Sequence, residues 1–156
     1  MEVNGYKIEP GANLRGANLF LANLNGANLS GANLRFSSLI SARLFHANLR
    51  GANLACAELS FAIMFRANLS RADLRDANLS LAILGFANLS RANLCGANLR
   101  AANLEGANLS FTDLSRANLS DTDLSRANLA YANLADANLD GANLKGATMP
   151  DVTIHD

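Results

Sequence analysis

The feature that most constrains this chain is a large apolar residue at every fifth position. From Leu14 to Met149 there are twenty-eight such centres without an interruption, and all are Leu except Met64 and Met149. Two positions before the centre stands Ala in twenty-five of these units, and the position directly before the centre is mostly Asn. A pattern repeated this often indicates one repetitive architecture over the whole segment.

A period of five excludes both an ordinary helix and a flat strand. On an α-helix five residues turn through about 500°, so successive centres would spread around the axis. On a flat strand an odd period sends alternate centres to opposite faces. All centres share one interior only if the chain bends after every unit and coils around an axis. We therefore expect Leu and the Ala two positions before it to face inward, and Asn, which tolerates turns and bonds to nearby backbone, to suit the bend.

The units GANLR, RANLS and RADLR resemble the motif of the pentapeptide repeat family, Ala-(Asp/Asn)-Leu-X-X. The resemblance extends from Ala12 to Met149, and the ending GATMPDVTIHD is similar to the tails of many short cyanobacterial members. It implies an all-β fold, a right-handed four-sided parallel β-helix with four units per coil. The twenty-eight units then give about seven coils. The residue before each centre and the two residues after it would face solvent.

The residues alone leave the size of a coil open. Outward residues recur at a spacing of twenty, as in Ile63 with Ile83, and also at a spacing of twenty-five, as in Phe36, Phe61 and Phe86. The family resemblance favours twenty.

Both ends of such a stack need closing, because each leaves an unpaired strand edge. Pro10 and Pro150 are the only prolines, and they flank the array, where a missing N–H matters least. An Asn-Gly pair at Asn4 lies between short apolar runs, which is a hairpin signal. We expect both caps to be slight. The expected divisions are an N-terminal cap at 1–11, the pentapeptide-repeat β-helix at 12–149, and a C-terminal tail or cap at 150–156.

Composition indicates a soluble, cytoplasmic protein. No apolar run reaches the roughly 18 residues of a membrane helix, and the first residues lack the apolar segment of a signal peptide. Cys56 and Cys95 fall on the same side, two coils and about 10 Å apart, which is too far for a disulfide. Reduced thiols agree with an intracellular location.

Net charge is zero, but the two halves of the array differ in sign. Between Ala12 and Arg100, nine Arg stand against three acidic residues, whereas from Ala101 to Asp156 eight acidic residues stand against three basic ones. An asymmetry of this kind hints at partners or self-association.

Residues capable of catalysis are few and scattered. His46 and His155 have no Cys or acidic residue at metal-ligand spacing, and outward serines such as Ser60 and Ser80 have no His within reach. No Gly-x-Gly-x-x-Gly or Walker motif opens a helix. We therefore expect no enzyme, no catalytic or metal-binding residues, no cofactor and no small-molecule substrate.

All seven Phe residues occupy outward positions, although the centres have room for large apolar side chains. On the second and third sides of the early coils they join other apolar residues, and a contiguous exposed apolar cluster usually marks an interface. The alternative is that the rings lie along the coils and cover backbone. The expected protein interface consists of Phe45, Phe61, Ile63, Phe65, Leu81, Ile83 and Phe86.

The leading hypothesis is a non-enzymatic scaffold or regulatory rod that binds a protein partner, or a second copy of itself, through these residues. Family members that inhibit topoisomerases look like duplex DNA because they carry dense acidic columns. The outward Asn column departs from that pattern because it is neutral, and the arginines spread over several sides instead of converging on a phosphate. Neither nucleic acid nor membrane is an expected partner. The alternative is a DNA-mimic inhibitor of a DNA-binding enzyme acting through acidic C-terminal coils, with Asp113, Asp121, Asp123, Asp136 and Asp140.

Overall fold

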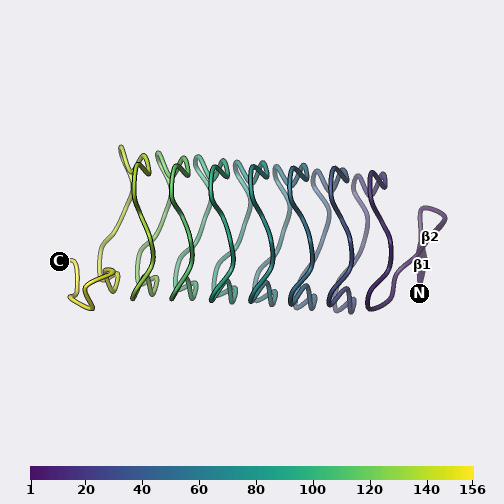
Figure 1. The fold of residues 1–156 in the computed structure, drawn as a ribbon, viewed down its shortest axis with the longest axis horizontal. Coiled ribbons are helices and arrows are strands. Elements are labelled where there is room, and N and C mark those ends of the chain that lie inside the picture. The colour runs from purple at the N-terminus through teal and green to yellow at the C-terminus, as the bar shows by residue number, and fades with distance from the viewer.

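The computed structural model describes residues 1–156 as one continuous stack of turns (Figure 1). Parallel β-bridges hold the stack together, and each joins residues twenty apart, from Asn13–Asn33 at one end to Asn128–Thr148 at the other. Twenty residues therefore make one turn, and the expected four-sided parallel β-helix is confirmed. The spacing of twenty-five is a staircase, in which the Phe residues of the series lie on successive corners, each one turn further along. The structure contains no helix of the length and apolar character needed to span a membrane.

Each turn contributes one five-residue unit to each of the four sides. Side 1 is set by the centre Leu14, side 2 by Leu19, side 3 by Leu24 and side 4 by Leu29, and later centres follow at intervals of twenty. Within a unit we call the residue before the centre the preceding position. The residue after the centre is the following position, and the next residue is the corner.

Backbone hydrogen bonds run along the stack and also close each corner. The N–H of a centre donates to the carbonyl of the preceding position one turn on, as Leu19 does to Ser38 at 2.7 Å. At the corner, the N–H of Ala22 donates back to the Leu19 carbonyl at 3.0 Å and closes a four-residue turn. The corner residue has a positive φ, +55° at Leu21, as the third residue of a type II turn does.

This geometry corrects part of the role expected of Asn. The bend lies at the corner rather than at Asn, which sits in the β-bridge of the preceding position. The Asn side chain does bond to nearby backbone, because Oδ1 of Asn68 accepts the Ser70 N–H at 3.1 Å. The amide of Asn48 also donates to Asn28 one turn below, at 3.2 Å. Asn therefore braces the side of the coil, and the left-handed conformation falls on whichever residue occupies the corner.

The interior is filled by the centres and by the small residues two positions before them. Centres such as Met64 and Leu94 have no exposed surface. Three polar residues replace Ala in the interior, and each hydroxyl donates to a backbone carbonyl, so no buried polar side chain lacks a partner. These pairs are Ser37 with Leu34, Thr112 with Leu109, and Thr122 with Leu99.

The N-terminal end of the stack is covered by the only two regular strands, β1 (Glu2–Val3) and β2 (Tyr6–Lys7), which form an antiparallel hairpin (Figure 1). Val3 and Tyr6 pack against the core, and Ile8 is buried in it. The Tyr6 hydroxyl accepts the N–H of Asn18 at 3.2 Å and ties the hairpin to side 2.

The C-terminal end is covered on one side only. The tail turns back after Pro150, so that Ile154 forms an antiparallel bridge with Thr148 on side 4. The Gly146 N–H donates to the His155 carbonyl at 2.7 Å. The last centres of all four sides are half-buried, namely Leu134, Leu139, Leu144 and Met149.

Candidate protein interface

The seven residues expected at an interface lie on three consecutive turns, on side 3 and its two corners. We call them the side-3 patch. Ile63 and Ile83 take the preceding position and form a parallel bridge with each other. The others are Phe45 and Phe65 at the following position, Phe61 and Leu81 at the corner between sides 2 and 3, and Phe86 at the corner between sides 3 and 4.

Exposure divides the side-3 patch into two groups. The exposed group is Phe61 (54%), Leu81 (47%), Ile83 (42%) and Phe86 (49%). The half-buried group is Phe45, Ile63 and Phe65. Sequence spacing places all seven outward but does not separate the two groups, because the difference arises from contacts between turns.

Three rings of the side-3 patch form a chain along the stack. The ring centroids of Phe45 and Phe65 are 5.8 Å apart, and those of Phe65 and Phe86 are 5.7 Å apart. These distances are typical of tilted and edge-to-face aromatic pairs. Phe61 makes no ring contact with the chain, so its exposed face is free of aromatic neighbours.

Two glycines of the following turns lie against this aromatic chain. A Cβ atom on the buried Gly85 would lie 3.2 Å from Cδ2 of Phe65, and a Cβ atom on Gly106 would lie 2.6 Å from Cε1 of Phe86. The rings of Phe65 and Phe86 therefore lean over the backbone of the next turn, in space that only glycine leaves open. Gly85 is at a following position, whereas the other glycines of the repeat are at corners. Its φ is not in the left-handed region, so the turn does not require glycine there. A glycine at this unusual position is the signal in the sequence for the ring contact.

Three members of the patch hold strained backbone. Phe61, Leu81 and Phe86 have φ values of +59°, +60° and +57°. Large side chains are uncommon in this region, and the conformation costs about 1–2 kcal/mol per residue. Many corners carry Gly, the residue that adopts a positive φ most easily. The frequent Gly at this position of the repeat is the signal in the sequence for a left-handed corner.

Basic residues lie beside the side-3 patch, and acidic residues are absent from it. Arg43 precedes Ile63 on side 3 by one turn, and His46 and Arg66 occupy the corner column that also holds Phe86. The Arg66 guanidinium carbon lies 5.4 Å from the Phe65 ring centroid. On these three turns, side 3 and its corners contain no Asp or Glu.

The other arginines are distributed over several sides, as expected. On side 1 the guanidinium carbons of Arg15 and Arg35 lie 5.3 and 4.9 Å from the Phe36 ring centroid. Arg75 makes two hydrogen bonds to Asp73, at 2.8 and 2.6 Å. The Arg75 guanidinium holds the pKa of the Asp73 carboxyl below its ordinary value of 3.8. These contacts are local pairs and do not form a phosphate site.

The residues with catalytic or ligating chemistry are not brought together. His46 lies beside Phe45, with ring centroids 6.4 Å apart, whereas His155 lies in the tail. No three His, Cys, Asp or Glu side chains are grouped as metal ligands. Cys56 and Cys95 are free thiols, and Nη2 of Arg116 donates to Sγ of Cys95 at 2.9 Å.

The acidic residues of the C-terminal turns are interleaved with cationic and amide groups. Oδ2 of Asp121 lies 3.6 Å from Nε of Arg100. Asp113 and Asp123 each accept a side-chain amide from an Asn one turn on, at 3.1 Å. Hydrogen bonds from Ser115 hold the pKa of Asp113 below its ordinary value. Asp136 and Asp140 are exposed at the end of the stack.

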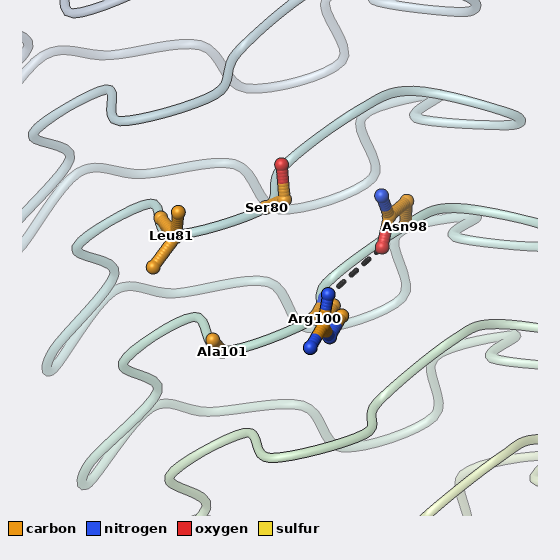
Figure 2. Close-up of a pocket in the computed structure, with 5 residues that line it drawn as sticks. All are labelled: Ser80, Leu81, Asn98, Arg100 and Ala101. Carbon is orange, nitrogen blue, oxygen red and sulfur yellow. Dashed lines mark hydrogen bonds between the residues drawn. The ribbon is translucent and has the colours of Figure 1, made fainter.

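A shallow hollow adjoins the patch on side 2 (Figure 2). Its volume is about 310 Å³, and Leu81 and Ala101 line it at the corner between sides 2 and 3. The Arg100 N–H donates to Oδ1 of Asn98 at 3.1 Å within it. A second hollow of about 340 Å³ lies nearer the C-terminus and is lined by polar residues and Gly146. Neither holds a set of catalytic groups.

Comparison with protein families gives one match. The family described as pentapeptide repeats matches eight copies along the chain, over residues 10–35, 42–80, 82–121 and 117–156. A comparison with curated proteins found no match.

Among solved structures, the chain is similar to HetL of the cyanobacterium Nostoc sp. strain PCC 7120, a pentapeptide repeat protein involved in the regulation of heterocyst differentiation. The two are 32% identical over 96% of this chain and 93% of HetL, with a TM-score of 0.41. The pentapeptide repeat protein alr5209, also from Nostoc PCC 7120, is 49% identical over 55% of this chain and 66% of its own, with a TM-score of 0.46.

The fold is also similar to that of a trypsin-treated variant of QnrB1, a plasmid-mediated fluoroquinolone resistance protein. The TM-score is 0.61 at 20% identity, over 88% of this chain and 85% of QnrB1, and at this identity the likeness concerns the fold alone. The family match covers most of the chain, and its repeat is the unit that builds the four-sided coil. The chain therefore belongs to the pentapeptide repeat family.

Proposed function

We propose that the protein is a non-enzymatic, cytoplasmic interaction rod that binds a protein partner through the side-3 patch. One observation carries the proposal. Four large apolar side chains, each 42–54% exposed, lie together on successive turns of a stack whose interior accommodates large apolar residues at every centre. A contiguous exposed apolar surface of this kind is typical of a binding site in a soluble protein.

The exposed group and the half-buried group contribute differently to this proposal. Phe65 covers the backbone at Gly85, so part of its apolar surface is already used within the stack. Phe61 and Leu81 lie on a corner, and neither side chain covers a glycine of the next turn. The exposed group is therefore where a partner removes the most apolar surface from water.

The magnitudes agree with reversible binding. Fully burying a large apolar side chain contributes roughly 1.5–3 kcal/mol. Four half-exposed side chains give on the order of 4 kcal/mol after scaling by their exposure, before polar contacts at the rim. Micromolar affinity requires about 8 kcal/mol, so the patch supplies a substantial share and a polar rim is needed for the rest.

The test uses two matched double variants. Phe61→Ser with Leu81→Ser removes the exposed corner of the patch, and Phe111→Ser with Tyr131→Ser removes two stacked side chains from adjacent turns of another corner. We expect both variants to fold, because neither pair fills the core. The patch variant should lose partner capture from native lysate by about tenfold, the effect of losing 1.4 kcal/mol, and the corner control should retain it.

Two outcomes would contradict the proposal. If the patch variant keeps every captured protein and its sedimentation behaviour, the side-3 patch is not a binding surface. If it unfolds while the control remains folded, the corner side chains stabilise the coil.

The acidic C-terminal turns give less support to DNA mimicry. A mimic needs a continuous anionic surface, but Arg100 lies against Asp121, and Nη1 of Arg126 lies 3.8 Å from Oε1 of Glu105. The preceding positions of side 4 carry neutral Asn on turn after turn. We therefore place the interaction on side 3.

A further inference from the structure

We propose that the partner segment bound by the side-3 patch is an amphipathic helix with acidic residues beside its apolar face. This inference rests on the proposed function of the patch and adds the chemistry of what it binds. It follows from the charges beside the patch and from the backbone hydrogen bonds of side 3, which leave no free strand edge.

The charge around the patch has one sign. Arg43 and Arg66 are exposed, and neither makes an ion pair, since the four ion pairs of the structure involve other residues. Arg66 lies over the Phe65 ring, so its guanidinium is held at the edge of the apolar surface. The first acidic residue further along side 3 is Glu105, which faces Arg126. A carboxylate from a partner therefore meets two guanidiniums that have no acidic partner within the chain.

The same observation disfavours a second copy of the chain as the occupant. Two copies docking patch to patch bring four guanidiniums into one interface, and this face contributes no carboxylate from either copy. Removing unpaired guanidiniums from water is unfavourable. A carboxylate from an acidic partner offsets part of that cost.

The backbone beneath the patch indicates which kind of segment fits. The Met64 N–H donates to the Ile83 carbonyl at 2.7 Å, and the Ile63 N–H donates to the Ala42 carbonyl at 2.9 Å. Side 3 thus presents side chains and no free strand edge on these turns, so a partner cannot add a strand there. A helix satisfies its backbone hydrogen bonds internally. It can therefore bind an apolar surface through the apolar stripe of side chains along one face. Three turns of the stack span about 10 Å at the β spacing, close to the diameter of a helix.

The test uses two synthetic helical peptides of about 18 residues, which is longer than the roughly 12–15 residues below which isolated helices are marginal in water. Both carry Leu along one face; one carries Glu on the flanking positions, and the other carries Lys there. Binding to the full chain is measured by fluorescence anisotropy at low and high salt. We expect the Glu peptide to bind at least about tenfold more tightly than the Lys peptide, and the difference to shrink as salt screens the charges.

Charge reversal on the protein supplies the matched control. Arg43→Glu with Arg66→Glu should remove the preference for the Glu peptide. Arg71→Glu with Arg91→Glu changes the net charge by the same amount and should leave the preference unchanged. Both residues lie on the corner between sides 4 and 1, away from side 3, with φ of +60° and +59° against +56° at Arg66. Loss of preference in the Arg71 and Arg91 variant would mean that net charge, rather than this site, selects the peptide.

The outcomes separate this inference from the proposed function. If both peptides bind equally, and the Phe61 and Leu81 variant abolishes both, the patch is an interface but its partner is not selected by charge. If the peptides do not bind, and the chain instead self-associates through the patch in sedimentation experiments, the occupant is a second copy. If neither peptide binds and the patch variant also retains its captured proteins, both proposals are wrong.

Discussion

The two ends of the stack close to different extents, although the same repeat builds both. At the N-terminal end Leu14, Leu19 and Leu24 are at most 3% exposed, because the β1–β2 hairpin lies over them. At the C-terminal end the last centres of all four sides are half-buried, including Met149 on side 4, the only side with which the tail pairs. Each turn of the repeat thus covers the core of its neighbour, but residues outside the repeat are needed to cover the core at an end.

The difference lies in apolar burial rather than in backbone pairing. In the first turn the N–H groups of Asn13, Asn23 and Asn28 have no backbone acceptor, and in the last turn the same is true of Leu134, Leu139 and Leu144. Both ends therefore leave strand edges to solvent. A few non-repeat side chains, Val3, Tyr6 and Ile8, are enough to cover the core at one end and leave it open at the other.

The largest expected effect is a charge placed at equivalent centres of side 2. Leu19→Asp puts a carboxylate into fully buried space near the covered end, where we expect a loss of at least about 4 kcal/mol or failure to fold. Leu139→Asp lies at the open end, where water reaches the side chain, and should cost less than half as much. Urea unfolding followed by far-UV circular dichroism measures both. Equal losses would mean that the C-terminal turn is as closed as the first.

Removing the segments that cover each end should give a smaller but still unequal pair of effects. Deleting residues 1–8 exposes the first turn and removes three packed side chains, Val3, Tyr6 and Ile8, for a loss of roughly 3–5 kcal/mol. Deleting residues 151–156 removes a few backbone hydrogen bonds at an exposed edge, about 1–2 kcal/mol in total. The unfolding midpoints of the two truncations give the comparison, and a larger shift for the C-terminal truncation would reverse it.

The smallest expected effect is a loss of stability of the C-terminal tail at low pH. Oδ1 of Asp151 accepts the Thr153 hydroxyl and N–H at 2.6 and 3.1 Å, and these bonds hold the pKa of Asp151 below its ordinary value of 3.8. Because the folded tail binds the proton less well than the unfolded tail, its stability is fully present above pH 3.8. That contribution is lost as pH falls through the lower folded pKa.

Hydrogen exchange should reveal this loss as faster exchange of the Gly146 and His155 amides on acidification, after correction for the intrinsic pH dependence. The N-terminal hairpin amides serve as the internal reference. Asp151→Asn should remove the pH dependence of the difference. Its persistence in that variant would assign the effect to another group.

Much of the coil was predictable from the sequence, and the reasons are physical. A period of five admits one interior, so the inward positions of Leu and Ala followed from Leu14 onward. The choice between twenty and twenty-five residues per turn did not follow, because both spacings occur among outward residues such as Phe61, and the family resemblance was needed. The closure of the N-terminal end was not readable either, since Val3, Tyr6 and Ile8 lie outside the repeat.

The candidate interface was predictable in position but not in exposure. The five-residue repeat places both Phe61 and Phe65 at outward positions and does not distinguish their exposure. Their different burial depends on Gly85, twenty residues after Phe65 and therefore directly above it in the stack. A contact of this kind becomes visible in the sequence only after the length of a turn is known.

The uniform positive φ of the corners separates what the surface displays from what keeps the rod folded. Arg, Asp, Leu and Phe all occupy corners at nearly the same backbone angle, between +55° at Asp76 and +60° at Leu81. The strain is a property of the backbone, so it cancels when one of these residues replaces another. A corner residue can then change without refolding the coil, and a new side chain there alters recognition at almost constant stability. The corner positions are therefore sites at which a substitution changes the surface that the rod presents while the coil stays folded.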